Sequence, residues 1–356
     1  MVFSSVRFFT KFGHFGELIR VLKKSHEINI VSIGEMGGGV NGSKYTKMNL
    51  WRFTAYRQIC YLLFPLIAIK ISQFCLKNNI DVIVGFNGGY PQLVAHLASI
   101  ICRKPFVVYV RVNHKEIRRI GRANFLLSTI WDSTITFSLR YAKRVIALSC
   151  YLFKSALSWG IDKKKVALIP FGVDAEVFRP LEANQIYPNP IVFVGRWSKE
   201  KGTDLLITLA ERLPQVDFIL VGASRSKLNS ILKNLHPVGF VPHVDVPKFI
   251  AMGKAVISTS KTEGQPMGCL EALACGKPVL ANKKGGLAEM ITPEVGWLFD
   301  GDDIDSTVDV IENALASPDL LRKGQCAREY AMAYSWESHR VKFDCLLSQT
   351  LKCEKS

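Results

Sequence analysis

The feature that most constrains this chain is an alternation of short apolar runs with helical patterns, which recurs in both halves of its 356 residues. In the first half, the expected strands are Val2–Phe9, Ile28–Ile33, Asp81–Gly85, Phe106–Val110, Arg144–Leu148 and Val166–Ile169. Helical patterns lie between them at Glu17–Lys24, Leu93–Ile101 and Tyr151–Trp159. Strands that alternate with helices form parallel sheets with crossover helices. The predicted fold class is therefore α/β, built from Rossmann-like doubly wound sheets.

The second half restarts the same pattern after a stretch containing Pro180, Pro188 and Pro190. We expect strands at Ile191–Gly195, Asp217–Gly222, Ala255–Thr259 and Val279–Ala281, with helices at Thr203–Arg212 and Cys269–Cys275. The length is too great for one ordinary domain and sufficient for two.

We therefore expect a first domain over residues 1–182 and a second domain over residues 183–335. A final helix over residues 336–356 is expected to return to the first domain. Two doubly wound domains that face a central cleft would bind ligands at the carboxyl ends of their strands.

The most informative segment runs from Glu263 to Val279. A strand is expected to end near Thr259, and a Gly/Pro-containing loop then carries Glu263. We expect a helix to open near Gly268 with Glu271 in its first turn. Free backbone amides at Gly268, Cys269 and Leu270 would bind a phosphate, helped by the helix dipole.

Glu263 and Glu271 flank that point and would accept hydrogen bonds from hydroxyls on either side of a pyrophosphate. A sugar nucleotide presents that arrangement of sugar, two phosphates and ribose. Each acid alone has an ordinary explanation, as a solvated loop charge or as an acid that stabilises a helix dipole.

This segment resembles the paired-glutamate motif of retaining glycosyltransferases of the GT-B fold, specifically family 4 (glycosyl transferases group 1). Further matches to landmarks of that family are Tyr141–Ser149, Ile169–Asp174, Phe193–Gly202, Gly285–Glu289 and Ser335–Glu337. The resemblance implies that Glu271 holds the donor ribose and that Glu263 holds sugar hydroxyls. It also implies that Arg196 and Lys201 clamp the donor pyrophosphate.

Two cations and a helix N-terminus can neutralise a leaving diphosphate without a metal. We therefore expect no metal and no cofactor, only a UDP- or GDP-sugar donor. Asp300, Asp302, Asp303 and Asp305 have the spacing of a metal motif. We interpret them as acids that open the helix Ser306–Ala316.

Three further positions come from the first half. Gly13 and Gly16 resemble the family's first-domain glycine loop, which approaches the donor phosphate, although a plain tight turn is an alternative. The family often carries a histidine just after the strand here formed by Phe106–Val110. An ungapped reading places Arg111 there, with His114 three residues later. His114 is favoured for the sugar contact, Arg111 is an alternative that contacts the sugar or a phosphate, and a loop histidine without a role is a third interpretation.

The positive charge is concentrated in the first half. Residues 1–180 contain 26 Lys and Arg against 9 Asp and Glu, which gives +17, whereas residues 181–356 contain 20 and 21, which gives −1. Such an asymmetry implies an anionic partner for the first half.

Cationic and aromatic residues interleave in two stretches of the first half: Lys44, Tyr45, Lys47, Trp51, Arg52, Phe53, Tyr56 and Arg57, then Arg118, Arg119, Arg122 and Phe125. This composition suits the interface of an anionic membrane. It would equally suit single-stranded nucleic acid, or a solvated face above core aromatics.

Three observations bear on the expected cellular compartment. Nine Cys are scattered without a CxxC pair, which is typical of reduced thiols in a cytosolic protein. The N-terminus lacks the pattern of a signal peptide. The apolar run Ile59–Leu76 contains Pro65 and Lys70 and is too short for a bilayer span, so we interpret it as a buried helix. We expect a cytoplasmic protein that attaches peripherally to the membrane.

The sequence thus predicts a retaining, metal-independent hexosyltransferase that acts on a glycan or lipid-linked acceptor, with no nucleic acid partner. The alternatives are a non-catalytic nucleic-acid-binding protein, which would use the basic first half, and a GT-B epimerase or phosphorylase.

Overall fold

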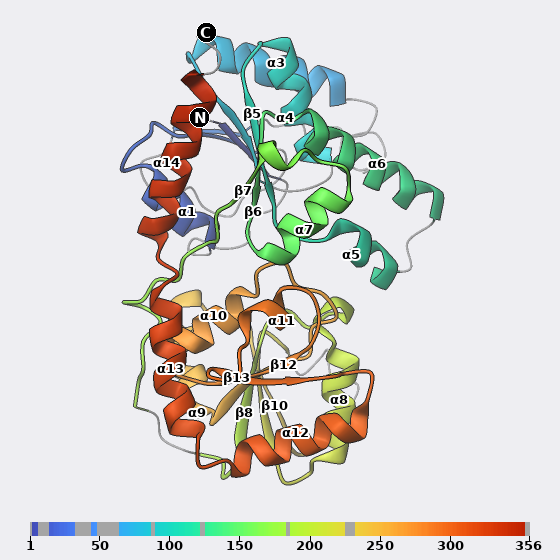
Figure 1. Ribbon diagram of the computed structural model, residues 1–356, viewed down its shortest axis with the longest axis vertical. Coiled ribbons are helices and arrows are strands. Elements are labelled where there is room, and N and C mark those ends of the chain that lie inside the picture. The colour runs from blue at the N-terminus through green and yellow to red at the C-terminus, as the bar shows by residue number, and fades with distance from the viewer. Residues whose placement is uncertain are drawn as a thin grey trace. The chain divides into compact units, whose positions relative to one another are not determined.

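The computed structural model describes residues 2–5, 14–32, 44–47, 64–86, 90–121, 125–182, 186–224 and 232–352. The chain divides into two compact units. The first contains Met1–Arg118, Arg122–Pro170 and Glu337–Ser356, and the second contains Arg119–Gly121 and Phe171–Trp336. Each unit has one parallel sheet (Figure 1), which confirms the predicted α/β class.

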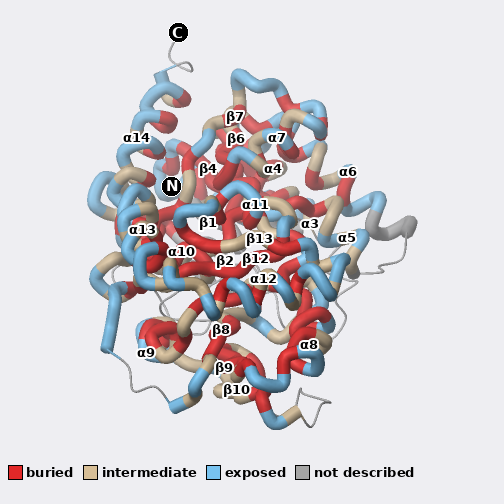
Figure 2. The backbone as a smooth tube through the Cα atoms, turned by 60° about the horizontal axis from the view of Figure 1, so that its bottom comes forward, coloured by how far each residue is buried: buried red, intermediate tan, exposed pale blue. Residues whose placement is uncertain are grey.

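The sheet of the first unit has the strand order β3-β2-β1-β4-β5-β6-β7, and every pair is parallel. Its strands are β1 (Val2–Ser5), β2 (Asn29–Ser32), β3 (Lys44–Lys47), β4 (Ile83–Gly85), β5 (Phe106–Val110), β6 (Arg144–Ala147) and β7 (Val166–Leu168). All five residues of β5 are buried, as Figure 2 shows for the central strands. A strand covered on both faces requires such a continuous apolar run, which is why the sequence located it correctly.

The helices of the first unit are α1 (His14–Leu22), α3 (Phe64–Lys77), α4 (Tyr90–Ile101), α5 (His114–Gly121), α6 (Phe125–Tyr141), α7 (Cys150–Ser158) and α14 (Trp336–Lys352). Helix α7 begins where the landmark Tyr141–Ser149 ends. The Ser149 hydroxyl accepts a hydrogen bond from the Leu152 amide at 3.2 Å. A serine N-cap thus satisfies one of the amides that the first turn leaves open.

Helix α3 corrects the interpretation of the run Ile59–Leu76 as a buried helix. Its inner side is buried at Ile67, Ile71 and Cys75, but Leu66 and Leu76 are more than half exposed. Within the part of the chain that the structure describes, no helix has the length and hydropathy needed to cross a bilayer.

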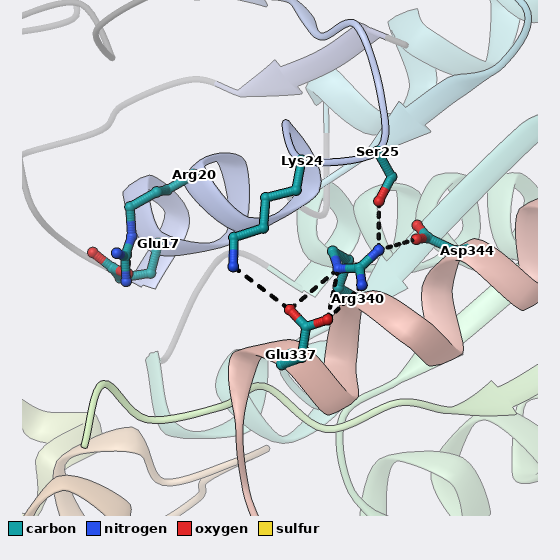
Figure 3. Close-up of polar contacts among 7 residues, drawn as sticks. All are labelled: Glu17, Arg20, Lys24, Ser25, Glu337, Arg340 and Asp344. Atoms are coloured by element: carbon teal, nitrogen blue, oxygen red, sulfur yellow. Dashed lines mark hydrogen bonds and ion pairs between the residues drawn. The ribbon is translucent and has the colours of Figure 1, made fainter. Parts of the chain in front are cut away.

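Helix α14 packs on the first unit through both its buried and its exposed sides. His339 donates or accepts a hydrogen bond with the Tyr109 hydroxyl at 3.1 Å, and Phe343 stacks on the Tyr109 ring. On the outer side, Arg340 contacts Glu337, Asp344 and the Ser25 hydroxyl that follows α1 (Figure 3).

The sheet of the second unit has the order β10-β9-β8-β11-β12-β13, again entirely parallel. Its strands are β8 (Pro190–Val194), β9 (Asp217–Val221), β10 (Leu235–Gly239), β11 (Ala255–Ser258), β12 (Val279–Asn282) and β13 (Gly296–Phe299). Its helices are α8 (Thr203–Arg212), α9 (Val246–Met252), α10 (Met267–Ala274), α11 (Gly286–Met290), α12 (Ile304–Ala316) and α13 (Leu320–Met332).

Two helix termini of this unit follow from local chemistry. Gly276, at φ 70°, ends α10, and Lys277 donates back to the Ala272 carbonyl at 3.0 Å. Only glycine adopts that left-handed conformation without strain. At α12, the Asp303 carboxylate accepts from the Ser306 amide at 3.1 Å. This acid therefore opens the helix, as the sequence predicted.

The division between the units differs from the predicted boundary at 182/183. The chain already joins the second unit at Phe171, because Val173 and Phe178 are buried in that unit's core. The prolines predicted a linker at this part of the chain, but the buried side chains determine where the second unit begins.

Strands β3, β10 and β13 were absent from the prediction. Strands β3 and β10 form sheet edges, and β10 carries His236 and Pro237 in place of an apolar run. Edge strands need less apolar surface, so their sequence signal is weak.

Candidate active site

Glu263 lies in the loop between β11 and α10, and two groups of the second unit hold its carboxylate. The Lys201 ammonium lies 2.5 Å from Glu263 Oε1, and the Ser260 hydroxyl donates to the same oxygen at 2.9 Å. The Lys201 and Glu263 side chains are only 26% and 15% exposed. The loop thus holds a cation and an acid in a mostly buried ion pair.

Two glycines explain why this loop passes so close to its neighbours. Gly202 has φ 66°, and a Cβ on it would lie 1.9 Å from the Thr259 carbonyl oxygen. On the other side, the Gly286 amide donates to the Glu263 carbonyl at 2.8 Å, and a Cβ on Gly286 would lie 2.1 Å from the Gly264 oxygen. The Glu200-Lys201-Gly202 and Gly285-Gly286 landmarks therefore position the Glu263 loop.

The start of α10 corrects part of the predicted phosphate site. Helix α10 begins at Met267, and the Pro266 carbonyl accepts from the Cys269 amide at 3.0 Å and from the Leu270 amide at 3.1 Å. These two amides are therefore engaged in the first helical turn and were wrongly predicted to be free. Of the three amides predicted to be free, that of Gly268 does not donate to the Pro266 carbonyl.

The structure brings Lys201, Glu263, Gly268 and Cys269 to one small hollow at the amino end of α10. Its volume of about 20 Å³ is the space of a single water molecule. A diphosphate is too large to enter a space of this size. Burial raises the pKa of the Cys269 thiol to about 12, so this side chain stays protonated and acts by packing.

Helix α10 begins at Met267, one residue before the predicted start. Glu271 therefore lies in its second turn and not in the first. Its side chain is 5% exposed, and its Oε1 lies 2.6 Å from His243 Nε2. His243 opens a short 3-10 turn, His243–Asp245, and its ring lies 4.9 Å from that of Phe178.

His243 is a residue that the sequence analysis missed. A histidine directly after Val241-Pro242 gives no periodic signal, and its contact with Glu271 spans 28 positions. The sequence feature that could have pointed to it is a histidine within a short stretch rich in valine and proline.

Arg196 is not part of the Lys201–Glu263 group. Its side chain is 79% exposed, and its guanidinium lies 3.1 Å from Glu200 four residues later. Of the two cations predicted to clamp the pyrophosphate, Lys201 is held in an ion pair and Arg196 is exposed to solvent. An exposed pair of this kind is weak, so an anion can compete for Arg196.

Arg111 and His114 both line a pocket of about 170 Å³ in the first unit, together with Tyr109, Leu139 and Trp159. Arg111 lies over the Phe86 ring at 4.5 Å, and burial lowers its pKa to about 10.

His114 begins α5, is 9% exposed and packs on Trp159 with ring centroids 4.3 Å apart. Burial, with Lys115 and Arg118 nearby, lowers its pKa to about 4. Its buried Nε2 makes no hydrogen bond with any described residue. The imidazole is thus neutral at ordinary pH and suited to a hydroxyl.

The predicted glycine loop is only partly described. Gly13 lies outside the described residues. Gly16 lies within α1, which begins at His14, and so is not in a loop. The helix begins earlier than the expected Glu17 because Phe15 already contributes to the core, at 4.8 Å from Phe86.

The arrangement in the second unit has a definite chemical capacity. A lysine ammonium and a helix amide favour a phosphate, and partly buried carboxylates accept hydrogen bonds from hydroxyl groups. The groups gathered here can therefore bind both anionic and hydroxyl groups.

Comparison with known proteins leads to the same family. The family of glycosyl transferases group 1 matches residues 180–329, and glycosyltransferase family 4 matches residues 14–177. Curated relatives include a phosphatidylinositol N-acetylglucosaminyltransferase component from Arabidopsis thaliana, 25% identical over 239 residues. D-inositol 3-phosphate glycosyltransferase from Mycobacterium tuberculosis is 28% identical over 204 residues. The matches cover 62% and 50% of this chain but only 53% and 42% of those relatives.

Solved structures share the fold over nearly the whole chain. Sucrose-phosphate synthase from Thermosynechococcus elongatus has a TM-score of 0.80 at 16% identity and 99% coverage of both chains. Anabaena HepE in complex with UDP and glucose has a TM-score of 0.77 at 19% identity and 98% coverage of both chains. With both halves matched by family and the fold matched throughout, the chain belongs to the family 4 (group 1) glycosyltransferases of the GT-B fold.

Proposed function

We propose that this glycosyltransferase moves a hexose from a UDP- or GDP-sugar to a glycan or lipid-linked acceptor, with retention of configuration and without a metal. The observation that carries this proposal is the Lys201–Glu263 ion pair beside the Gly268 amide at the start of α10. It places a cation, an amide donor and a carboxylate acceptor around one point, as a sugar diphosphate requires.

The roles follow from the contacts of each group. Lys201, Arg196 and the Gly268 amide would stabilise the departing diphosphate. Glu263 would accept hydrogen bonds from sugar hydroxyls once phosphate oxygens compete for Lys201. Glu271, oriented by His243, would hold the ribose. The solved HepE complexes with UDP and with UDP-glucose support a uridine nucleotide as the donor.

In the first unit, the neutral His114 and the partly buried Arg111 are proposed to contact the sugar, the acceptor or a phosphate. The relatives named for phosphatidylinositol and for inositol 3-phosphate support an acceptor with a phosphorylated polyol or a lipid. A lipid-linked acceptor would bring the protein to an anionic membrane surface.

Calorimetric titration of UDP and GDP tests the donor site. Glu271→Ala and Arg196→Ala are each expected to weaken nucleotide binding by about tenfold or more, the effect of one lost charge-assisted hydrogen bond. Lys199→Ala and Glu211→Ala remove an exposed cation and an exposed acid nearby and should bind as the unaltered protein does. Unchanged affinity in both site variants would refute the assignment.

Product analysis tests the reaction. The anomeric configuration of the product, followed by NMR, should match that of the donor, and EDTA should leave the rate unchanged. An inverted product, or activity that EDTA removes and Mg²⁺ restores, would contradict retention or metal independence respectively. Sugar interconversion without an acceptor would indicate an epimerase.

A further inference from the structure

Three neighbouring helices of the first unit expose apolar side chains to solvent. Helix α4 packs against both α3 and α6, so the three lie side by side (Figure 1). Exposed large hydrophobics gather on them, and six define the surface called here the α3–α4–α6 face: Leu66, Ile69, Leu76, Ile100, Ile101 and Phe137. Their exposed fractions range from 41% to 57%. A gathered apolar surface of this kind marks an interaction site, whereas scattered exposed leucines do not.

The apolar residues follow the helical period on the outer side of each helix. On α3, Leu66, Ile69 and Leu76 lie at positions i, i+3 and i+10, while the inward residues Ile67 and Ile71 are buried. A helix whose outer side is also apolar has a second partner, because its core contact is already made.

On α6, Ile130, Phe137 and Tyr141 lie at i, i+7 and i+11, and all three are exposed. Phe137 and Tyr141 have ring centroids 4.6 Å apart, and Phe137 lies 6.0 Å from the His96 ring of α4. The His96 ring is buried, so Phe137 packs at the junction of α6 and α4 while its outer side stays exposed.

The charge on these helices has one sign. Helices α3 and α4 contain no Asp or Glu, and the single acid of α6, Asp132, is buried and lies 2.8 Å from Arg118 Nε. Lys70 and Lys77 are exposed on α3 beside the apolar row, and Arg103 is exposed just after α4. Among the described residues these three cations make no ion pair.

The nearest exposed acid along the chain, Asp81, belongs to a different surface. It lines a hollow together with His26, Asn79 and Leu347, where α14 ends. It therefore does not offset the cations beside the α3–α4–α6 face.

We infer that the α3–α4–α6 face docks the first unit onto the surface of an anionic lipid bilayer. Apolar side chains of a surface helix insert at the boundary between headgroups and acyl chains, and flanking lysines and arginines contact the anionic headgroups. Exposed lysines beside an apolar row, with no acid exposed on these helices, match the negative charge of anionic headgroups. The inference deepens the proposed lipid-linked acceptor. It places docking on the outer sides of α3, α4 and α6, whereas the sequence pointed to two basic–aromatic stretches, of which Phe125 alone belongs to these helices.

Vesicle flotation tests the docking without any turnover. The full chain is mixed with vesicles of phosphatidylcholine alone or of phosphatidylcholine with phosphatidylglycerol, at low and high salt. We expect flotation only with phosphatidylglycerol, and weaker flotation at high salt, because screening reduces the headgroup contacts. Equal flotation with both lipid mixtures would overturn the inference.

Two matched pairs of variants locate the surface. Ile69→Ser with Ile100→Ser, and separately Lys70→Glu with Lys77→Glu, should each reduce the bound fraction by about tenfold or more. The controls are Phe240→Ser with Leu321→Ser, which are more exposed residues of the second unit, and Lys163→Glu with Lys164→Glu, which change the same charge elsewhere in the first unit. If the control variants lose as much flotation as the face variants, the assignment is wrong.

Two further measurements separate this inference from its rivals. UDP binding by calorimetry should be unchanged in the face variants, so a failed donor site and a failed docking surface give different results. Sedimentation velocity tests a second copy of the chain as the occupant. A dimer that dissociates on Ile69→Ser with Ile100→Ser, with flotation unchanged, would overturn lipid docking.

Discussion

The ionisable side chains around the Glu263 loop of the second unit and those in the pocket of the first unit have different neighbours. Around the loop, Lys201 lies 2.5 Å from Glu263, and His243 lies 2.6 Å from Glu271. In and beside the pocket, Arg111 lies over Phe86, His114 over Trp159, and His339 stacks beside Tyr109.

The difference teaches what each unit is prepared for. A lysine beside a carboxylate is charged, and in the proposed reaction a donor phosphate would compete with Glu263 for Lys201. A histidine in apolar surroundings stays neutral, because burial penalises the charged form. The first unit should therefore be the more acid-sensitive of the two.

The largest expected effect is on the loop that holds the ion pair. Gly202→Ala should destabilise the second unit by about 3 kcal/mol or more, because the new Cβ would lie 1.9 Å from the Thr259 carbonyl oxygen. Gly239→Ala is the control, since its φ of 85° is equally left-handed but nothing lies within 4 Å of its Cβ. It should cost about 1–2 kcal/mol, the strain alone. Urea denaturation measures both, and equal losses would show that the close approach is unimportant.

The next prediction separates the paired lysine from the exposed arginine. Lys201→Met should cost about 2 kcal/mol of stability, since it leaves the partly buried Glu263 without its cation. Arg196→Met should cost less than about 0.5 kcal/mol, because its side chain is 79% exposed. Both should weaken UDP binding. Thermal unfolding and calorimetry on the same samples check this, and equal stability losses would erase the contrast between the two cations.

Acid should act chiefly on the first unit. His114 and His339 each have a pKa of about 4 in the folded chain, against an ordinary value of 6.5, because both are buried. The unfolded chain therefore takes up protons first as the pH falls. Stability is complete above about pH 6.5 and declines toward pH 4, by about 2 kcal/mol per histidine near pH 5.

Hydrogen exchange resolved by unit would measure this decline. His114→Phe keeps a ring over Trp159 and removes one titrating group, so its stability should depend less steeply on pH. A variant with the same pH slope as the unaltered protein would show that His114 does not contribute.

The smallest expected effect concerns the outer side of α14. Arg340→Ala should lower the melting temperature measurably, because the guanidinium contacts Glu337, Asp344 and Ser25 together (Figure 3). Arg20→Ala is the matched control, because its side chain is 63% exposed and lies beside Glu17 on α1. It should change the melting temperature very little. If both variants lower the melting temperature equally, the contacts of Arg340 stabilise the protein no more than an exposed ion pair does.

The sequence by itself determined the parts that depend on local pattern. Buried parallel strands such as Phe106–Val110 are continuous apolar runs, and the glycine at 276 ends a helix wherever the fold places it. The segment from Glu263 to Glu271 was predicted as a site because two acids flank an expected helix start, and the structure places that helix start at Met267.

Only the tertiary structure decided how side chains distant in sequence meet. Lys201 and Glu263 are 62 positions apart, and His243 and Glu271 are 28 apart. The outer side of α3 was mistaken for core because apolar residues occur on both its sides, and which side is covered depends on α4. Local propensity fixes the element and its ends, whereas burial and pairing depend on which neighbours the sheet brings alongside, and a single sequence does not contain that information in any short window.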